Sequence, residues 1–164
     1  MTKQKRTTIA HFINSTPDET ADTWELLGAG INSLTMNYNA NVVSETPIHQ
    51  DTANTSVESY APTIPVEQYV YPGDDAYDYI DALRQAGPAT FADAETEIVE
   101  VRKYETPDTP GTSYPATKWP CCISFDTFGG DGGASGKIAF TININGDPED
   151  GDFNTSTLAF TATA

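Results

Sequence analysis

The chain has 164 residues, of which 38% are hydrophobic and 20% are charged, a composition that suits one globular domain with a modest core. Its formal net charge of −16 at pH 7 excludes a free-standing reader of double-stranded DNA, because such proteins gain most of their affinity from basic side chains on phosphates. No apolar run approaches the roughly 18 residues that a membrane helix needs. Residues 1–20 lack an apolar segment, so we expect no signal peptide and no membrane partner.

The N-terminal part of the chain is polar and rich in turn-forming residues. We expect an extended arm or loop over residues 1–22 and a short strand over residues 23–27. The Gly-Ala-Gly of residues 28–30 indicates a turn, and a longer strand follows over residues 31–43.

The strand expected over residues 31–43 has one apolar face and one polar face without charge, because successive side chains alternate. The apolar face presents Leu34, Met36, Tyr38, Ala40 and Val42. The polar face presents Thr35, Asn37, Asn39 and Asn41. Strands usually disfavour asparagine, so this second face needs a reason beyond ordinary exposure to solvent.

A polar loop over residues 44–54 leads into a segment rich in β-forming residues, 55–71. Pro62 and Pro65 interrupt this segment and indicate an edge, a bulge or a break, because proline cannot donate to a strand ladder. The two faces of the segment are therefore left unassigned.

One helix is predicted over residues 74–86. Asp74 or Asp75 can cap its N-terminus, and apolar residues recur at helical spacing through Leu83. Gly87 and the proline that follows it end the helix. Its one-sided apolar stripe needs a partner surface, for which a sheet is expected.

The C-terminal half predicts further strands over 95–105 and 118–128, and then over 137–145 and 155–163. The last two strands repeat the uncharged polar face of the earlier one. That face carries Thr141, Asn143 and Asn145, then Thr155, Thr157 and Thr161. The pattern predicts one domain, residues 1–164, that is mostly β: an antiparallel β-sandwich or open barrel with one flanking α-helix and extended loops.

The chemistry-bearing residues indicate neither an enzyme nor a cofactor. His11 and His49 are both expected in loops, with no defined nucleophile and acid nearby. Cys121 and Cys122 are adjacent and are read as reduced apolar residues, because neighbours make only a strained disulfide. The acidic turn at 147–152 lacks EF-hand spacing, so an ordinary hairpin turn is favoured and calcium binding is left open.

Three stretches resemble the tail tube proteins (major tail proteins) of long-tailed bacteriophages. The first is TWELLGAGINSLTMNYNANVVSETPI at 23–48, the second is YPGDDAYDYIDALRQAG at 71–87, and the third is GKIAFTININGDPEDGDF at 136–153. They occur in the order of that family, and the first is the most specific.

The resemblance implies a subunit that forms stacked hexameric rings, a hollow tube through which DNA passes during ejection as cargo and not as a bound ligand. Long hairpins over 31–71 and 137–163 would then line the channel. The implied partners are copies of itself, a tape-measure protein, and the tail terminator and distal tail proteins. The implied location is the virion tail, assembled in the bacterial host cytoplasm, and whether the tail is flexible, contractile or free of a genome is left open.

A channel wall that must release DNA should carry neutral amides and hydroxyls, because each inward Lys or Arg would hold a phosphate. The expected channel-facing residues are Thr35, Asn37, Asn39, Asn41, Thr141, Asn143, Asn145, Thr155, Thr157 and Thr161. The expected contacts between rings are Lys3, Lys5, Arg6, Glu45 and Asp51, although the basic residues also fit a frayed terminus. The alternative function is a β-sandwich binding module on a virion or cell surface, such as a decoration or adhesin-like protein.

Overall fold

The computed structural model describes residues 2–85, 87–107 and 111–163 and is mostly antiparallel β-structure. The strands are β1 (Ile9–Asn14), β2 (Trp24–Leu26), β3 (Ile31–Leu34), β4 (Ala40–Glu45), β5 (Asn54–Tyr60), β6 (Thr63–Tyr69), β7 (Glu95–Arg102), β8 (Ser113–Gly129), β9 (Lys137–Ile144), β10 (Glu149–Asn154) and β11 (Ala159–Ala162). The helical elements are α1 (Asp75–Gln85) and two 3-10 turns, η1 (Arg6–Thr8) and η2 (Phe91–Ala94).

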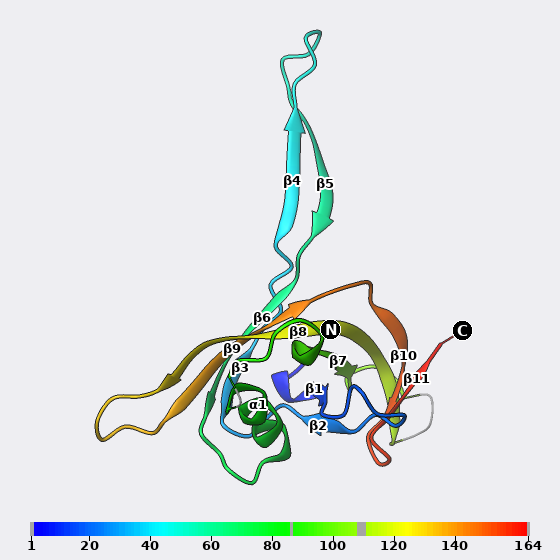
Figure 1. Cartoon of the computed structure of the whole chain (residues 1–164). Helices are drawn as coiled ribbons and strands as arrows, with labels where there is room; N and C mark the ends of the chain where they lie inside the picture. The colour runs from blue at the N-terminus through cyan, green and yellow to red at the C-terminus, as the bar shows by residue number, and fades with distance from the viewer. Residues whose placement is uncertain (1, 86, 108–110, 164) are drawn as a thin grey trace.

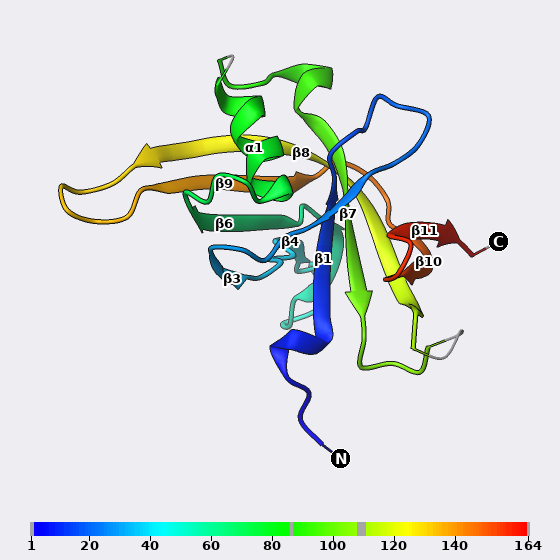
Figure 2. The same cartoon turned by 90° about the horizontal axis from the view of Figure 1, so that it is seen from below.

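One strongly twisted sheet forms the body, in the order β2-β1-β7-β8-β9-β6-β3 (Figures 1 and 2). The long strand β8 links its two halves, because it pairs with β7 and β10 near its start and with β9 near its end. β11 adds to β10, and β4 and β5 form a separate two-stranded hairpin that stands away from the body. The expected β-rich sandwich with one flanking α-helix is confirmed.

The main core lies between α1 and one face of the sheet. Ala76, Tyr77 and Ile80 of the helix are buried in the same cluster as Phe140 and Ile142 of β9. The helix begins where the sequence predicts, because the Asp74 carboxylate accepts a hydrogen bond from the Tyr77 amide at 3.0 Å. Residue 86, its expected last residue, lies outside the described residues.

A second, smaller core lies on the other side of β1 and β7, where β10 covers them. Phe12 stacks on Phe153 with ring centroids 4.5 Å apart, and Trp24 meets the edge of the same ring at 6.2 Å. Val99 and Val101 of β7 complete the cluster. The two cores together bury β1 on both faces.

The expectation of an arm over residues 1–22 is therefore wrong for β1, which is an interior strand paired with β2 and β7. Both faces of β1 are buried, so Ile9–Asn14 lacks the alternation that marks a half-exposed strand. His11 lies in this strand and is only 5% exposed, which corrects its expected place in a loop.

The strand expected over residues 31–43 is two strands, β3 and β4, with residues 35–39 between them. Asn39 has a φ of 48°, a left-handed conformation that asparagine tolerates, and this ends the alternation of one continuous face. The break expected near Pro62 is present between β5 and β6, whereas Pro65 lies inside β6 opposite Thr141.

The pairing of 137–145 with 155–163 is also wrong. β9 pairs with β6 and β8, while β10 occupies most of the expected acidic turn and pairs with β8 and β11. Asp and Gly are uncommon in strands, so the Asp-Gly-Asp sequence does not predict β10. The strand requires glycine at position 151, because a Cβ atom there would lie 2.2 Å from the Thr161 carbonyl oxygen. The acidic side chains of β10 have partners: Glu149 pairs with Lys118 at 2.9 Å, and Asp150 accepts a hydrogen bond from Thr117.

Both cysteines are free thiols, as expected, with Cys121 buried and Cys122 half-buried. Burial raises the pKa of the Cys121 thiol well above its usual range, which keeps it protonated and unreactive. Across the described part of the chain, no helix is both long and apolar enough to span a bilayer.

Candidate functional site

The side of β6, β9 and the end of β8 that faces away from α1 is a polar surface with little charge, which we call the polar face. Its residues are set by the strand register and share the direction opposite to the main core. They are Thr63, Pro65, Glu67 and Tyr69 of β6; Lys137, Ala139, Thr141 and Asn143 of β9; and Cys122, Ser124, Asp126 and Thr127 of β8. In β9, buried Ile138, Phe140 and Ile142 alternate with these half-exposed residues, as the sequence predicts.

The polar groups of this face are hydrogen-bonded largely to one another. Asn143 Nδ2 donates to Ser124 Oγ at 3.0 Å, and Thr141 Oγ1 donates to an Asp126 carboxylate oxygen at 3.0 Å. Such internal pairing leaves fewer free donors and acceptors for a passing ligand.

The polar face is not wholly uncharged, because β6 and β8 add carboxylates that the single-strand pattern does not reveal. Glu67 forms an ion pair with Lys137, with 2.7 Å between nitrogen and oxygen. Since the one lysine of the face is neutralised in this way, Asp126 leaves a small negative excess. A polyanion would be weakly repelled here.

The asparagines of the strand predicted over residues 31–43 do not share a strand face. Asn37 forms an isolated bridge with Thr63 and so adjoins the polar face. Asn39 Nδ2 donates to Thr63 Oγ1 and to the Ala61 carbonyl oxygen, each at 3.0 Å, and thereby ties the hairpin to β6. Asn41 lies on the projecting hairpin opposite Ser59, and Thr35 lies in the linking segment.

The C-terminal threonines lie away from the polar face. Thr161 is in β11 and faces Asp152 across the β10–β11 pair, while Thr155 donates to the Thr112 carbonyl oxygen. Thr157 is exposed in the turn between these strands. Figure 2 shows β10 and β11 beside the opposite end of β8 from β6 and β9, so the strand register separates this set from Thr141 and Asn143. Asn145 follows β9 and donates to Glu95.

The residues expected at contacts between rings lie in two places. Glu45 and Asp51 are exposed on the β4–β5 hairpin and its tip, and Lys3 and Lys5 are exposed ahead of β1. Arg6 is different, because its guanidinium donates to Nδ1 of His11 at 3.3 Å and to the Leu34 carbonyl oxygen. Arg6 therefore anchors the arm to its own subunit.

His11 joins this arm to the body, because it lies between the Arg6 guanidinium and the Glu100 carboxylate. A guanidinium has no acceptor, so Nδ1 of His11 accepts from Arg6 and Nε2 carries the proton, 3.5 Å from a Glu100 carboxylate oxygen. The hydrogen bond from His11 lowers the pKa of the Glu100 carboxyl, against the opposing effect of burial. This arrangement is a structural anchor. Within the described residues, no group of three or more His, Cys, Asp or Glu side chains is placed to hold a metal ion.

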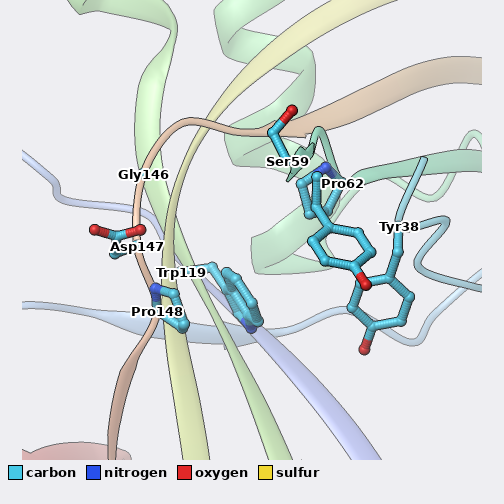
Figure 3. Close-up of a pocket in the computed structure, with 8 residues that line it drawn as sticks. Tyr38, Ser59, Pro62, Trp119, Gly146, Asp147 and Pro148 are labelled. Atoms are coloured by element: carbon cyan, nitrogen blue, oxygen red, sulfur yellow. The ribbon is translucent and has the colours of Figure 1, made fainter. Parts of the chain in front are cut away.

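The base of the hairpin carries an aromatic hollow of about 700 Å³ that the sequence did not reveal (Figure 3). It is lined by Tyr38, Ser59, Tyr60, Pro62, Trp119, Gly146, Asp147 and Pro148. The rings of Tyr38 and Tyr60 meet edge to face, with centroids 6.3 Å apart. Because these residues come from the hairpin, β8 and the β9–β10 turn, no local pattern in the chain predicts their meeting.

Comparison with known proteins identifies the fold. No protein-family model matches the chain, and no curated protein matches it by sequence. Among solved structures, the chain is similar to one from the tail of an empty GTA (gene transfer agent) particle, determined with C6 symmetry. The TM-score is 0.61 at 14% identity, over 98% of this chain and all of the other. The chain thus has the fold of a phage-like tail tube protein, which confirms the resemblance found in the sequence at the level of the fold.

Proposed function

We propose that this protein is the subunit of a phage or phage-like tail tube, and that its polar face lines a lumen through which DNA passes without being held. The observation that carries the proposal is a whole-chain match in fold to a tail chain of C6 symmetry, together with a solvent-exposed sheet face of low charge. A subunit with this fold is built to associate with itself.

Two open strand edges support association into a ring. β3 pairs with β6 on one side, and in the described residues no strand pairs with its other edge. The end of β8, residues 123–129, pairs with β9, while its pairing with β7 stops at Cys122. Unpaired strand edges are templates for pairing with another chain.

These edges are compatible with a continuous antiparallel sheet across copies. The strands β8, β9, β6 and β3 alternate in direction, and four is an even number, so β3 of one copy runs antiparallel to β8 of the next. A heterologous contact of this kind closes into a ring when the rotation per copy divides a full turn. We place the polar face on the inside of that ring.

The charge distribution suits a conduit for DNA. The chain as a whole carries −16, and the single lysine on the polar face is paired with Glu67. Without free Lys or Arg at the wall, no phosphate anchor and no release of counterions would hold the DNA. The remaining repulsion acts over about 8 Å at physiological salt.

The hairpin sets a further requirement on the tube. Figure 1 shows β4 and β5 standing on the side of the sheet away from α1, which is also the side of the polar face. An open lumen requires the hairpin to lead toward a neighbouring ring instead of crossing the lumen. Residues 35–39 and 61–62 join it to the body, where the Asn37–Thr63 bridge and the Asn39 side chain hold its base.

A test uses purified tubes and linear DNA. Thr141→Lys combined with Asn143→Arg places two cations on the polar face, and Asp131→Lys combined with Ser135→Arg places two in the exposed β8–β9 turn as a control. We expect assembled tubes of the first variant to retain DNA at physiological salt, whereas wild-type and control tubes release it. Equal release by all three tubes would contradict the wall assignment.

The aromatic hollow favours a second candidate, a surface binding module for glycans, because sugar rings stack on exposed aromatic side chains. This candidate requires a persistent monomer with measurable glycan affinity. Electron micrographs of concentrated protein separate the two candidates, since the tube subunit forms rings or hollow rods.

A further inference from the structure

Among residues 2–85, 87–107 and 111–163, nothing covers the β4–β5 hairpin along most of its length. Every residue of β5 is exposed, and Val42, Val57 and Tyr60, which lie on one face of the hairpin, are each more than half exposed. An isolated two-stranded hairpin is at best marginally stable in water. Its apolar face therefore indicates a surface completed by another molecule.

The tip of the hairpin presents one large apolar side chain to solvent. Ile48 is 108% exposed relative to an extended reference, and it lies between Pro47 and His49 in the turn. A fully exposed isoleucine in an otherwise polar tip buries nothing in the free subunit, so contact with an apolar site on another molecule would be favourable.

The hollow at the base of the same hairpin is a site of matching character. Trp119, Tyr38 and Tyr60 supply aromatic walls, Pro62 and Pro148 extend them, and the hollow is open to solvent (Figure 3). Asp147 is the one charged residue in its lining. An apolar side chain followed by a histidine fits this combination of an aromatic interior and a carboxylate.

The hairpin cannot fill its own hollow. Its strand β5 runs from Asn54 near the tip to Tyr60 at the base, a span of roughly 20 Å at about 3.3 Å per residue. The tip of one copy can therefore reach such a hollow only on another copy.

We propose that Ile48 at the hairpin tip of one subunit inserts into the Tyr38–Tyr60–Trp119 hollow of a second copy, with His49 beside Asp147. The proposal rests on the proposed function, because it names the surface through which one ring meets the next. A tip-to-base contact is heterologous and leaves a free tip and a free base at the two ends. Such a contact propagates into a filament, as an exposed apolar side chain and a complementary pocket on one molecule do.

The first experiment is site-specific disulfide cross-linking. Ile48→Cys combined with Tyr60→Cys is prepared with Cys122→Ser, while Cys121 stays because it is buried. We expect oxidation to give a ladder of covalent dimers, trimers and longer species, because each copy supplies one tip and one base. The single cysteine variants should give no ladder, and neither should Ser135→Cys with Tyr60→Cys, which places one thiol in the β8–β9 turn. The same short products from all variants would overturn the proposal.

The second experiment mixes two variants that are each defective at one end. Ile48→Asp removes the tip and Tyr60→Asp removes the base, and the thermal midpoint of each confirms folding. We expect each alone to form rings but to need at least about tenfold more protein to form tubes, since a buried isoleucine contributes on the order of one tenfold step per contact. Rings of the two kinds, mixed, should stop at pairs, because only one tip-to-base junction can form.

The outcomes separate this proposal from the proposed function. Tubes of Ile48→Asp at the wild-type protein concentration would overturn the tip-to-base contact and leave the tube function intact. A wild-type protein that stays monomeric at all concentrations, or whose hollow binds glycan with tight affinity as a monomer, would overturn both.

Discussion

Strand β1 and the β4–β5 hairpin are the two extremes of this molecule. β1 is covered on both faces by two cores and paired on both edges. The hairpin is exposed along nearly all of its length, and the segments 35–39 and 61–62 attach it to β6. The comparison indicates that the two cores are complete within one subunit, whereas the apolar face of the hairpin is left for a neighbour to cover.

The largest expected difference between body and hairpin follows from creating a cavity in the main core. Phe140 is 0% exposed in the cluster beneath α1, so Phe140→Ala should lower the free energy of unfolding by about 3–5 kcal/mol. Val57→Ala in the hairpin should change it by less than about 0.5 kcal/mol. Urea titrations of both variants measure the difference, and similar losses at the two sites would contradict the division into body and hairpin.

A substitution at Gly151 tests the pairing of β10 with β11 at the edge of the body. An alanine there would place a Cβ atom 2.2 Å from the Thr161 carbonyl oxygen, so the two strands must separate. Gly151→Ala should cost about 1–3 kcal/mol of the free energy of unfolding. Gly132→Ala, where the added atom meets open space, is the control and should be nearly neutral. A neutral Gly151→Ala by thermal melting would show that β11 does not pair as described.

The anchor that joins the N-terminal segment to the body has a pH dependence of known sign. Because the folded pKa of Glu100 is lowered, its carboxylate stabilises the fold above its unfolded pKa, close to 4.5, and this contribution is lost as the pH falls through the folded pKa. Glu100→Gln should remove a contribution on the order of 1–2 kcal/mol near pH 7. The wild type and the variant should therefore converge in stability in acid, and a constant difference down to pH 2 would contradict the anchor.

The smallest expected effect on the free subunit concerns the polar face. Asn143→Lys should change the free energy of unfolding by less than about 0.5 kcal/mol, because the side chain is half-exposed and its hydrogen bond to Ser124 lies on the surface. DNA retention by assembled tubes should nonetheless increase. A large loss of stability would show that Asn143 supports the fold and does not merely present a surface.

Local sequence patterns were sufficient to predict those helices and strands that bury one face and expose the other. The alternation of β9 predicted both its core face and Thr141 and Asn143 opposite, and helical spacing with an aspartate cap predicted the start of α1 to within one residue. Such elements can be read from the sequence because burial imposes the period of the backbone on the residues.

The elements and sites that the sequence did not predict depend on contacts between segments that are distant in the chain. β1 has two buried faces and hence no alternation, and β10 is an acidic strand made possible by Gly151 and by Lys118 of β8. Which strands pair is set by β8, whose 17 residues serve three neighbours, and no single-strand pattern specifies this. The aromatic hollow was missed for the same reason.

The central claim is that the polar face turns inward in a ring of identical subunits. A cryo-electron microscopy reconstruction of the purified, polymerised protein tests it most directly. The account predicts stacked six-fold rings in which Thr141, Asn143 and Ser124 border an open lumen. A reconstruction with these residues on the outer surface, or buried between subunits, would contradict it.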